Sequence, residues 1–191
     1  MRSVRRRIGL YGGSFDPIHH GHLILAREAR EVLGLDEVVF IPAGVSPHKL
    51  HAPPAPAEIR AAMVKAAIDG EAGFSWSDIE VRRPGPSFAI ETVRHFATGS
   101  PGAEIFYFIG SDNLEALHTW KEIDALRRAA QFVVLARGGD CDVNDFPCIR
   151  RVVDISSTDI RNRVAAGRSV KYLVPDTVCA LIALHGLYRN E

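Results

Sequence analysis

The apolar positions of this chain follow two alternating patterns, short continuous runs and longer segments with helical spacing. A continuous apolar run closed by glycine or proline is typical of a buried strand in a parallel sheet covered on both faces. The runs therefore predict strands at 7–12, 37–44, 103–112 and 130–139, an extended segment at 74–83 and a last short strand at 151–156.

The segments between these runs predict helices. In the first of them Leu25, Ala29 and Val32 recur on one face, and Gly34 follows as a C-cap. Helices are predicted at 22–33, 58–69 and 88–97, one or two more within 114–128, and two toward the C-terminus separated by Gly167 and Pro175. The stretch 46–57, rich in proline and histidine, is too long for a tight turn and is predicted to be a functional loop.

Strands that alternate with helices predict a doubly wound α/β fold. We expect a Rossmann-like parallel sheet with helices on both faces and a small helical segment at the C-terminal end. The chain has 191 residues, 47% of them apolar, which is enough to bury the core of one domain. One domain over 1–191 is therefore predicted, with its last ~35 residues helical.

Charge and cysteine content exclude several classes of protein. Basic and acidic residues number 23 each, so no overall positive field marks a nucleic-acid binder. The three cysteines, Cys141, Cys148 and Cys179, lack metal-type spacing and predict neither a disulfide framework nor a zinc site. No apolar stretch is long enough to span a membrane. We therefore predict a cytoplasmic protein without nucleic-acid or membrane partners. The sequence leaves open whether it forms a homo-oligomer.

Candidate chemistry concentrates in YGGSFDPIHHGHL, residues 11–23. Gly12 and Gly13 follow a predicted strand, and ligands of open α/β sheets bind beyond the carboxyl ends of strands. His19 and His22 are three residues apart at a predicted helix start, where both imidazoles can face one anion, a phosphate above all. Turn chemistry, a bound metal or local backbone hydrogen bonds would explain the same residues equally well.

A second cluster, DISSTDIRNRV at 154–164, places Ser156, Ser157 and Thr158 before a predicted helix that carries Arg161. Helix capping explains one hydroxyl. A phosphate site at a helix N-terminus would use all three hydroxyls together with the guanidinium.

The pattern G-G-S-F-D-P-x-H-x-G-H resembles the signature of the nucleotidylyltransferase superfamily, which carries (H/T)xGH, and ISSTDIR resembles its ISSTxxR motif. The resemblance implies that His19, His22 and Arg161 are catalytic and act on the triphosphate of ATP. The ATP-binding residues that it implies are Gly12, Gly13, Ser14, Phe15, Gly110, Asp112, Ser156, Ser157, Thr158 and Arg161.

Three further segments resemble bacterial-type nicotinate mononucleotide adenylyltransferases: IPAGVSPHK (41–49), GSDNLEALHTW (110–120) and YLVPDTVCALIALHGLY (172–188). The implied reaction transfers the adenylyl group of MgATP to nicotinate mononucleotide and releases pyrophosphate. Mg²⁺ is expected on ATP, with no metal site of the protein's own. The implied mononucleotide-binding residues are His48, Lys49, Ser87, Ala89, Trp120 and Arg137.

Several of these residues also have structural explanations. Trp120 offers a ring for stacking but equally suits a core position, Asp112 suits an N-cap, and Arg137 suits a surface cation. The sequence departs from the family pattern at Ser14, which keeps a hydroxyl group, and at Ser46. It also departs at Phe88 and Ala89, where two hydroxyl groups of the family pattern are missing. The alternatives are a phosphopantetheine adenylyltransferase, which lacks the PHK loop, and a non-catalytic nucleotide sensor.

Overall fold

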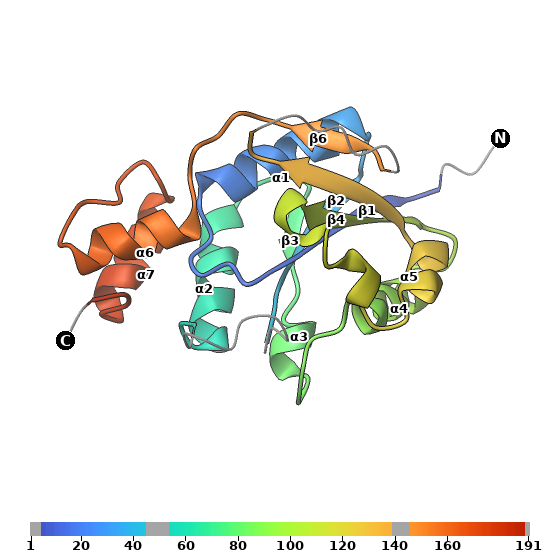
Figure 1. Cartoon of the computed structure of the whole chain (residues 1–191), viewed down its shortest axis with the longest axis horizontal. Helices are drawn as coiled ribbons and strands as arrows, with labels where there is room; N and C mark the ends of the chain where they lie inside the picture. Colours follow the sequence, from blue (N-terminus) through green and yellow to red (C-terminus); the bar gives the residue numbers. More distant parts are fainter. Residues whose placement is uncertain (1–4, 45–53, 139–145, 190–191) are drawn as a thin grey trace.

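A single parallel sheet organises the computed structural model, which describes residues 5–44, 54–138 and 146–189. Its strand order is β3-β2-β1-β4-β5-β6, and every neighbouring pair is parallel (Figure 1). The strands are β1 (Arg7–Gly13), β2 (Glu37–Pro42), β3 (Phe74–Trp76), β4 (Glu104–Gly110), β5 (Gln131–Ala136) and β6 (Cys148–Arg150).

Helices connect the strands and continue beyond them. They are α1 (His20–Val32), α2 (Ala57–Ile68), α3 (Ile79–Arg82), α4 (Ala89–Gly99), α5 (Ile123–Ala129), α6 (Ser157–Ala165) and α7 (Asp176–Leu184), with 3-10 turns η1 (Ser111–Asn113) and η2 (Leu117–Thr119). Figure 1 shows α6 and α7, orange and red, on the side of the molecule away from α4 and α5.

The core consists of two apolar clusters, one on each face of the sheet. Alternate strand residues enter opposite clusters, so that Phe106 and Phe108 lie in one and Ile105 and Tyr107 in the other. The first cluster also holds buried residues of α1, α2, α6 and α7, whereas the second holds those of α4 and α5. Helices therefore cover both faces, as the continuous apolar runs predicted.

The strand order reverses beside β1. The chain goes from β1 to β2 on one side and then crosses to β4 on the other side of β1. This is the topological switch point at which ligands of doubly wound folds bind, because the connections leave the carboxyl ends of the two central strands in opposite directions. The fold thus places the ends of β1 and β4, with Gly13 and Gly110, at one edge.

Two predicted elements are wrong. The strand expected at 151–156 is instead β6 at Cys148–Arg150, because its partner β5 ends at Ala136 and leaves the later residues beyond the ladder. The segment expected to be extended over 74–83 ends as β3 at Trp76 and turns into α3, where the Arg82 amide donates to the Asp78 carbonyl. The other helices and strands are confirmed, with ends shifted by a few residues.

The cysteine expectation also needs correction: Cys148 is disulfide-bonded, and Cys179 is free and half-buried. Among the described residues, no helix has both the length and the apolar character that a membrane span requires.

Candidate active site

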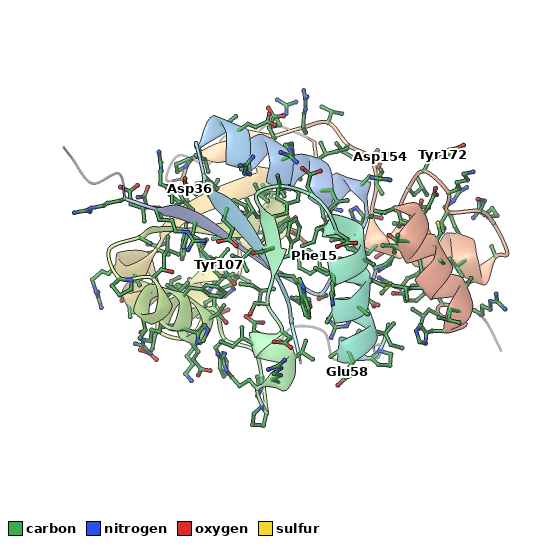
Figure 2. The ribbon with its side chains drawn as sticks, turned by 180° about the vertical axis from the view of Figure 1, so that it is seen from behind. Phe15, Asp36, Glu58, Tyr107, Asp154 and Tyr172 are labelled. Carbon is green, nitrogen blue, oxygen red and sulfur yellow. The ribbon has the colours of Figure 1, made fainter. Side chains whose placement is uncertain are left out.

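The turn from β1 to α1 carries the N-terminal motif, and aromatic side chains fill its interior. A Cβ atom at Gly12 would lie 2.9 Å from the Tyr107 hydroxyl, and one at Gly13 would lie 3.1 Å from the Phe15 ring. Phe15 itself is buried and has φ +46°, a conformation that costs an L-residue strain. Figure 2 shows it near the middle of the molecule. The two glycines at the end of β1 thus leave room for the aromatic side chains packed against them.

His19 and His22 lie against one another at the start of α1. Their ring centroids are 3.7 Å apart and the rings are inclined by 31°. The His19 backbone amide donates to Nδ1 of His22 at 3.2 Å, so the neutral His22 ring carries its proton on Nε2. Gly21 permits this arrangement, since a Cβ atom there would lie 3.0 Å from the His19 ring.

The His19 ring is fully buried, and neither ring nitrogen has a hydrogen-bond partner among the described residues. Burial lowers the pKa of His19 to about 3, and the positive charge of Arg137 acts in the same direction. His19 is therefore neutral near pH 7 and carries one N–H donor. A buried donor without a partner costs free energy, which a ligand oxygen would recover.

The backbone amides at the start of α1 are mostly used within the protein. The His20 amide donates to the Leu173 carbonyl at 3.0 Å, and the His22 amide to the His19 carbonyl at 2.9 Å. The sequence argument expected free amides of this helix to hold an anion. The amides of His20 and His22 are therefore not available to an anion.

The C-terminal motif lies directly beside the N-terminal one. Ser157 Oγ donates to the Pro17 carbonyl at 3.0 Å, and Arg161 Nη1 donates to the Asp16 carbonyl at 2.8 Å. Arg161 Nη2 donates to Thr158 Oγ1 at 3.2 Å, and Ser156 Oγ caps α6 by accepting from the Asp159 amide. Each of the three hydroxyls thus has a protein partner, so a ligand is not needed to explain them. The structure shows that these hydroxyls lie next to the β1–α1 turn.

Residues from two more strand ends complete this edge. Gly110 ends β4, and a Cβ atom there would lie 2.5 Å from Asp112 Oδ1, so glycine lets the carboxylate fold back over the strand end. Arg137 follows β5, donates to the Ile155 carbonyl at 2.9 Å, and its charge acts on His19 and Tyr11. Arg137 therefore lies close to both motifs, beside Ile155 and near His19.

Known proteins resemble this chain over nearly all of its length. A model of the cytidylyltransferase-like family matches residues 10–163. A probable nicotinate-nucleotide adenylyltransferase of Thermus thermophilus is 45% identical over 187 residues, which cover 96% of this chain and 100% of that protein. One of Symbiobacterium thermophilum is 40% identical over 205 residues, covering 97% of each. The chain belongs to the nicotinate-nucleotide adenylyltransferase family.

The fold of this adenylyltransferase family member is also found in solved structures. The nicotinic acid mononucleotide adenylyltransferase of Plasmodium falciparum, complexed with NaAD, superposes with a TM-score of 0.82 at 19% identity. The match covers 96% of this chain and 98% of that one. At this identity the likeness establishes the fold, and it agrees with the Rossmann-like architecture predicted from the sequence.

Of the residues expected to bind the mononucleotide, Ser87 and Ala89 lie at the start of α4 and Trp120 lies on the sheet face that α4 covers. Arg137, which was expected there too, lies instead beside the two motifs, near His19. Ser87 Oγ accepts from the Gly44 amide at 3.1 Å, which ties it to the end of β2, and Ala89 is the first residue of α4. Trp120 packs edge-on against Tyr107, with centroids 6.0 Å apart. Its backbone amide already donates to the Leu117 carbonyl, so it is not available to a substrate. His48 and Lys49 lie outside the described residues.

Sequence reasoning missed three buried residues at this edge: Asp16, Glu80 and Arg60. Asp16 accepts from the Tyr188 hydroxyl at 2.7 Å and from the Ala55 amide at 3.2 Å. Glu80 is buried, which raises its pKa, and the Thr92 hydroxyl donates to it at 2.6 Å. Arg60 is also buried. One signal was available, because Arg60 occupies the same helix face as Met63, Val64 and Ala67.

The buried neutral state of His19 predicts an acid-dependent loss of stability. The unfolded chain binds a proton at His19 below pH ~6.5, whereas the folded protein does not until pH about 3, so stability falls as the pH decreases through this window. Between pH 7 and pH 5 the free energy of unfolding should fall by about 2 kcal/mol on this account. Urea unfolding at both pH values measures it.

The variant His19→Asn should lose most of this pH dependence. The matched control, His95→Asn on the exposed face of α4, should keep it. An unchanged pH dependence in His19→Asn would contradict the assignment.

Proposed function

We propose that this chain transfers the adenylyl group of ATP to nicotinate mononucleotide, forming nicotinate adenine dinucleotide and pyrophosphate. The observation that carries the proposal is the junction of the two motifs. The start of α6 is hydrogen-bonded to the backbone of Asp16 and Pro17, beside the buried His19 ring. Membership of the family, with 45% identity over nearly the whole chain, supplies the substrates.

In this reaction an oxygen of the mononucleotide phosphate forms a bond to the α-phosphorus of ATP, and the bond from that phosphorus to the bridging oxygen breaks. Pyrophosphate leaves with the electron pair. The attacking phosphate is already an anion, so the protein needs no nucleophile or base of its own. Its task is to align the two phosphates and to stabilise negative charge as the bond to pyrophosphate breaks.

The geometry suits the ATP phosphates at the β1–α1 turn. His22, with its proton on Nε2, and the neutral His19 supply two imidazole donors within one stacked pair. Arg161 and Arg137 supply positive charge from the ends of two other elements. These donors are held in place before substrate binds, which is the condition under which hydrogen bonds and charges lower a barrier most.

Mg²⁺ enters this proposal with ATP, as part of the substrate. Within the described ranges, no three His, Cys, Asp or Glu side chains gather at metal-binding distance. We propose one nucleotidyltransferase domain over 1–191, whose helical C-terminal part contributes the arginine motif at the start of α6 to the shared site.

The pyridine side of the mononucleotide fits the start of α4. The first amides of a helix have no intrahelical partner, and those of Ala89 and Ile90 suit a carboxylate, although the family's two hydroxyls are replaced by Phe88 and Ala89. Trp120, in the same apolar cluster as Phe88 and Ala89, is assigned to stacking on the pyridine ring.

The test of the activity is a product analysis. Purified protein is incubated with MgATP and a panel of acceptors: nicotinate mononucleotide, nicotinamide mononucleotide and phosphopantetheine. Products are identified by mass, and pyrophosphate release is measured in parallel. Nicotinate adenine dinucleotide as the main product supports the proposal. Dephospho-coenzyme A would support the phosphopantetheine alternative, and no pyrophosphate with any acceptor would support a nucleotide sensor.

His22→Ala should lower kcat by roughly two to four orders of magnitude, because it removes a donor held in place for the transition state. Steady-state kinetics measure the loss, and thermal unfolding checks that the protein is folded. His95→Ala, an exposed histidine on α4, is the control and should keep full activity. Near-normal turnover in His22→Ala would remove His22 from the mechanism.

Arg161→Ala should raise the KM for ATP by about tenfold or more and lower kcat by less, because a guanidinium contact to the β- and γ-phosphates exists in both ground and transition states. Arg163, on the same helix, donates to the Ser169 carbonyl instead, so Arg163→Ala is the matched control. A fall in kcat at unchanged KM for ATP would assign Arg161 a different role.

We expect kcat/KM to be at least tenfold higher for nicotinate mononucleotide, the acid, than for nicotinamide mononucleotide, the amide. A carboxylate accepts from the amides at the start of α4, whereas the NH₂ group of nicotinamide would face one of them and leave a donor unpaired, at a cost of about 1–3 kcal/mol. The ratio is measured with both mononucleotides at saturating MgATP. Equal values would make this a dual-specificity enzyme.

A further inference from the structure

Arg60 lies on the first turn of α2, two residues after Glu58, which Figure 2 labels. Its exposed fraction is 2%, and it is the one buried Lys or Arg among the residues that the structure describes. Lysine and arginine are almost never fully buried unless their charge is compensated. Arg60 therefore calls for a physical explanation.

The guanidinium is compensated by three backbone carbonyls. Nη1 donates to Ser14 at 2.6 Å, Nη2 to Gly44 at 3.0 Å and Nε to Ala55 at 2.9 Å. Burial lowers the pKa of Arg60, and the negative charge of Asp16 opposes that shift. Within the described part of the chain, Asp16 forms no ion pair with Arg60. It accepts from the Ala55 amide and so holds the same segment from the other side.

The three carbonyls belong to three separate segments of the chain, which meet at this guanidinium. Ser14 follows β1 in the turn that carries the histidine pair. Gly44 follows β2, and its amide donates to Ser87 Oγ on the mononucleotide side. Ala55 precedes α2. One planar group thus connects the turn assigned to ATP with the strand end assigned to the second substrate.

The rigid fork of a guanidinium makes this connection possible. Its N–H donors point in fixed directions in one plane, whereas an ammonium is a compact charge that does not reproduce that pattern. Just before these residues, the Ala43 amide donates to the Gly13 carbonyl at 2.8 Å and joins the ends of β1 and β2. Arg60 extends this connection to Ser14 and Gly44, beyond the strand ends.

We propose that Arg60 is a positioning residue for adenylyl transfer: by holding the carbonyls of Ser14, Gly44 and Ala55 together, it sets the position of one substrate's phosphates relative to the other's. Arg60 contacts neither substrate in this proposal, which rests on the proposed function. The consequence is kinetic, because a displacement of about 1 Å between reacting groups costs up to a hundredfold in rate.

The test compares Arg60→Lys, which keeps the charge but not the fork, with Arg60→Gln, which keeps neither. Arg82→Lys on α3 is the matched control, since Arg82 is exposed and pairs with Asp78. Each variant is assayed at 15 °C for kcat and for the KM of both substrates, and kcat is expressed per folded molecule from near-UV circular dichroism.

Arg60→Lys is expected to lower kcat by about 10- to 100-fold, with both KM values changed by less than about threefold, while Arg82→Lys keeps parental values. A purely structural role would lower only the Tm, so kcat per folded molecule within twofold of the parent overturns the proposal. Arg60→Lys with parental kcat while Arg60→Gln loses activity would assign the effect to charge alone and also overturn it. If neither variant folds at 15 °C, Arg60 is required for folding, and the proposal is overturned as well.

The parent protein separates this test from that of the proposed function. If it uses a different acceptor, the comparison is made with that acceptor, and Arg60 is judged on kcat for adenylyl transfer. An inactive parent refutes the proposed function, whereas an active parent with an unaffected Arg60→Lys variant refutes only the role of Arg60.

Discussion

Two hydrogen bonds from the start of α6 to the carbonyls of Asp16 and Pro17 hold together segments 145 and 140 residues apart in the sequence. The β1–α1 turn is irregular backbone, so its carbonyls have no partner in the sheet and need one from elsewhere. Ser157 and Arg161 supply these partners. The requirement to pair buried backbone groups is thus what brings together, from the two ends of the chain, the residues of the proposed nucleotide site.

The buried polar side chains of the described residues follow the same edge rather than the centre of the core. They are Asp16, His19, Arg60, Glu80 and Thr92. Four of them have hydrogen-bond partners, whereas the His19 ring nitrogens have none. Such groups cost free energy, and a fold keeps them where they place backbone or meet a ligand. Their position agrees with the site that the two sequence motifs define.

The switch point explains how one sheet can hold the two proposed substrate sites side by side. β1 lies between β2 and β4, so its carboxyl end borders both the strand end that carries Gly44 and the one that carries Gly110. The apolar clusters on the two faces remain separate below this edge. At the strand ends, Arg60 and Asp16 join segments from the two sides through backbone carbonyls and amides.

The sequence by itself determined the fold class, the order of elements and the family, because apolar periodicity and motif letters are local properties of the chain. Residue types and spacing indicated His19, His22 and Arg161 as candidates for binding an anion, and the resemblance to the superfamily implied their catalytic role. Only the tertiary structure decided that β6 lies at Cys148–Arg150, since strand ends depend on where the partner strand stops. The tertiary structure also decided that the amides of His20 and His22 are already paired, that His19 is buried and neutral, and that Arg60 joins three segments. These features depend on contacts between residues distant in sequence, and burial and pairing, which set their energies, exist only once those residues have come together.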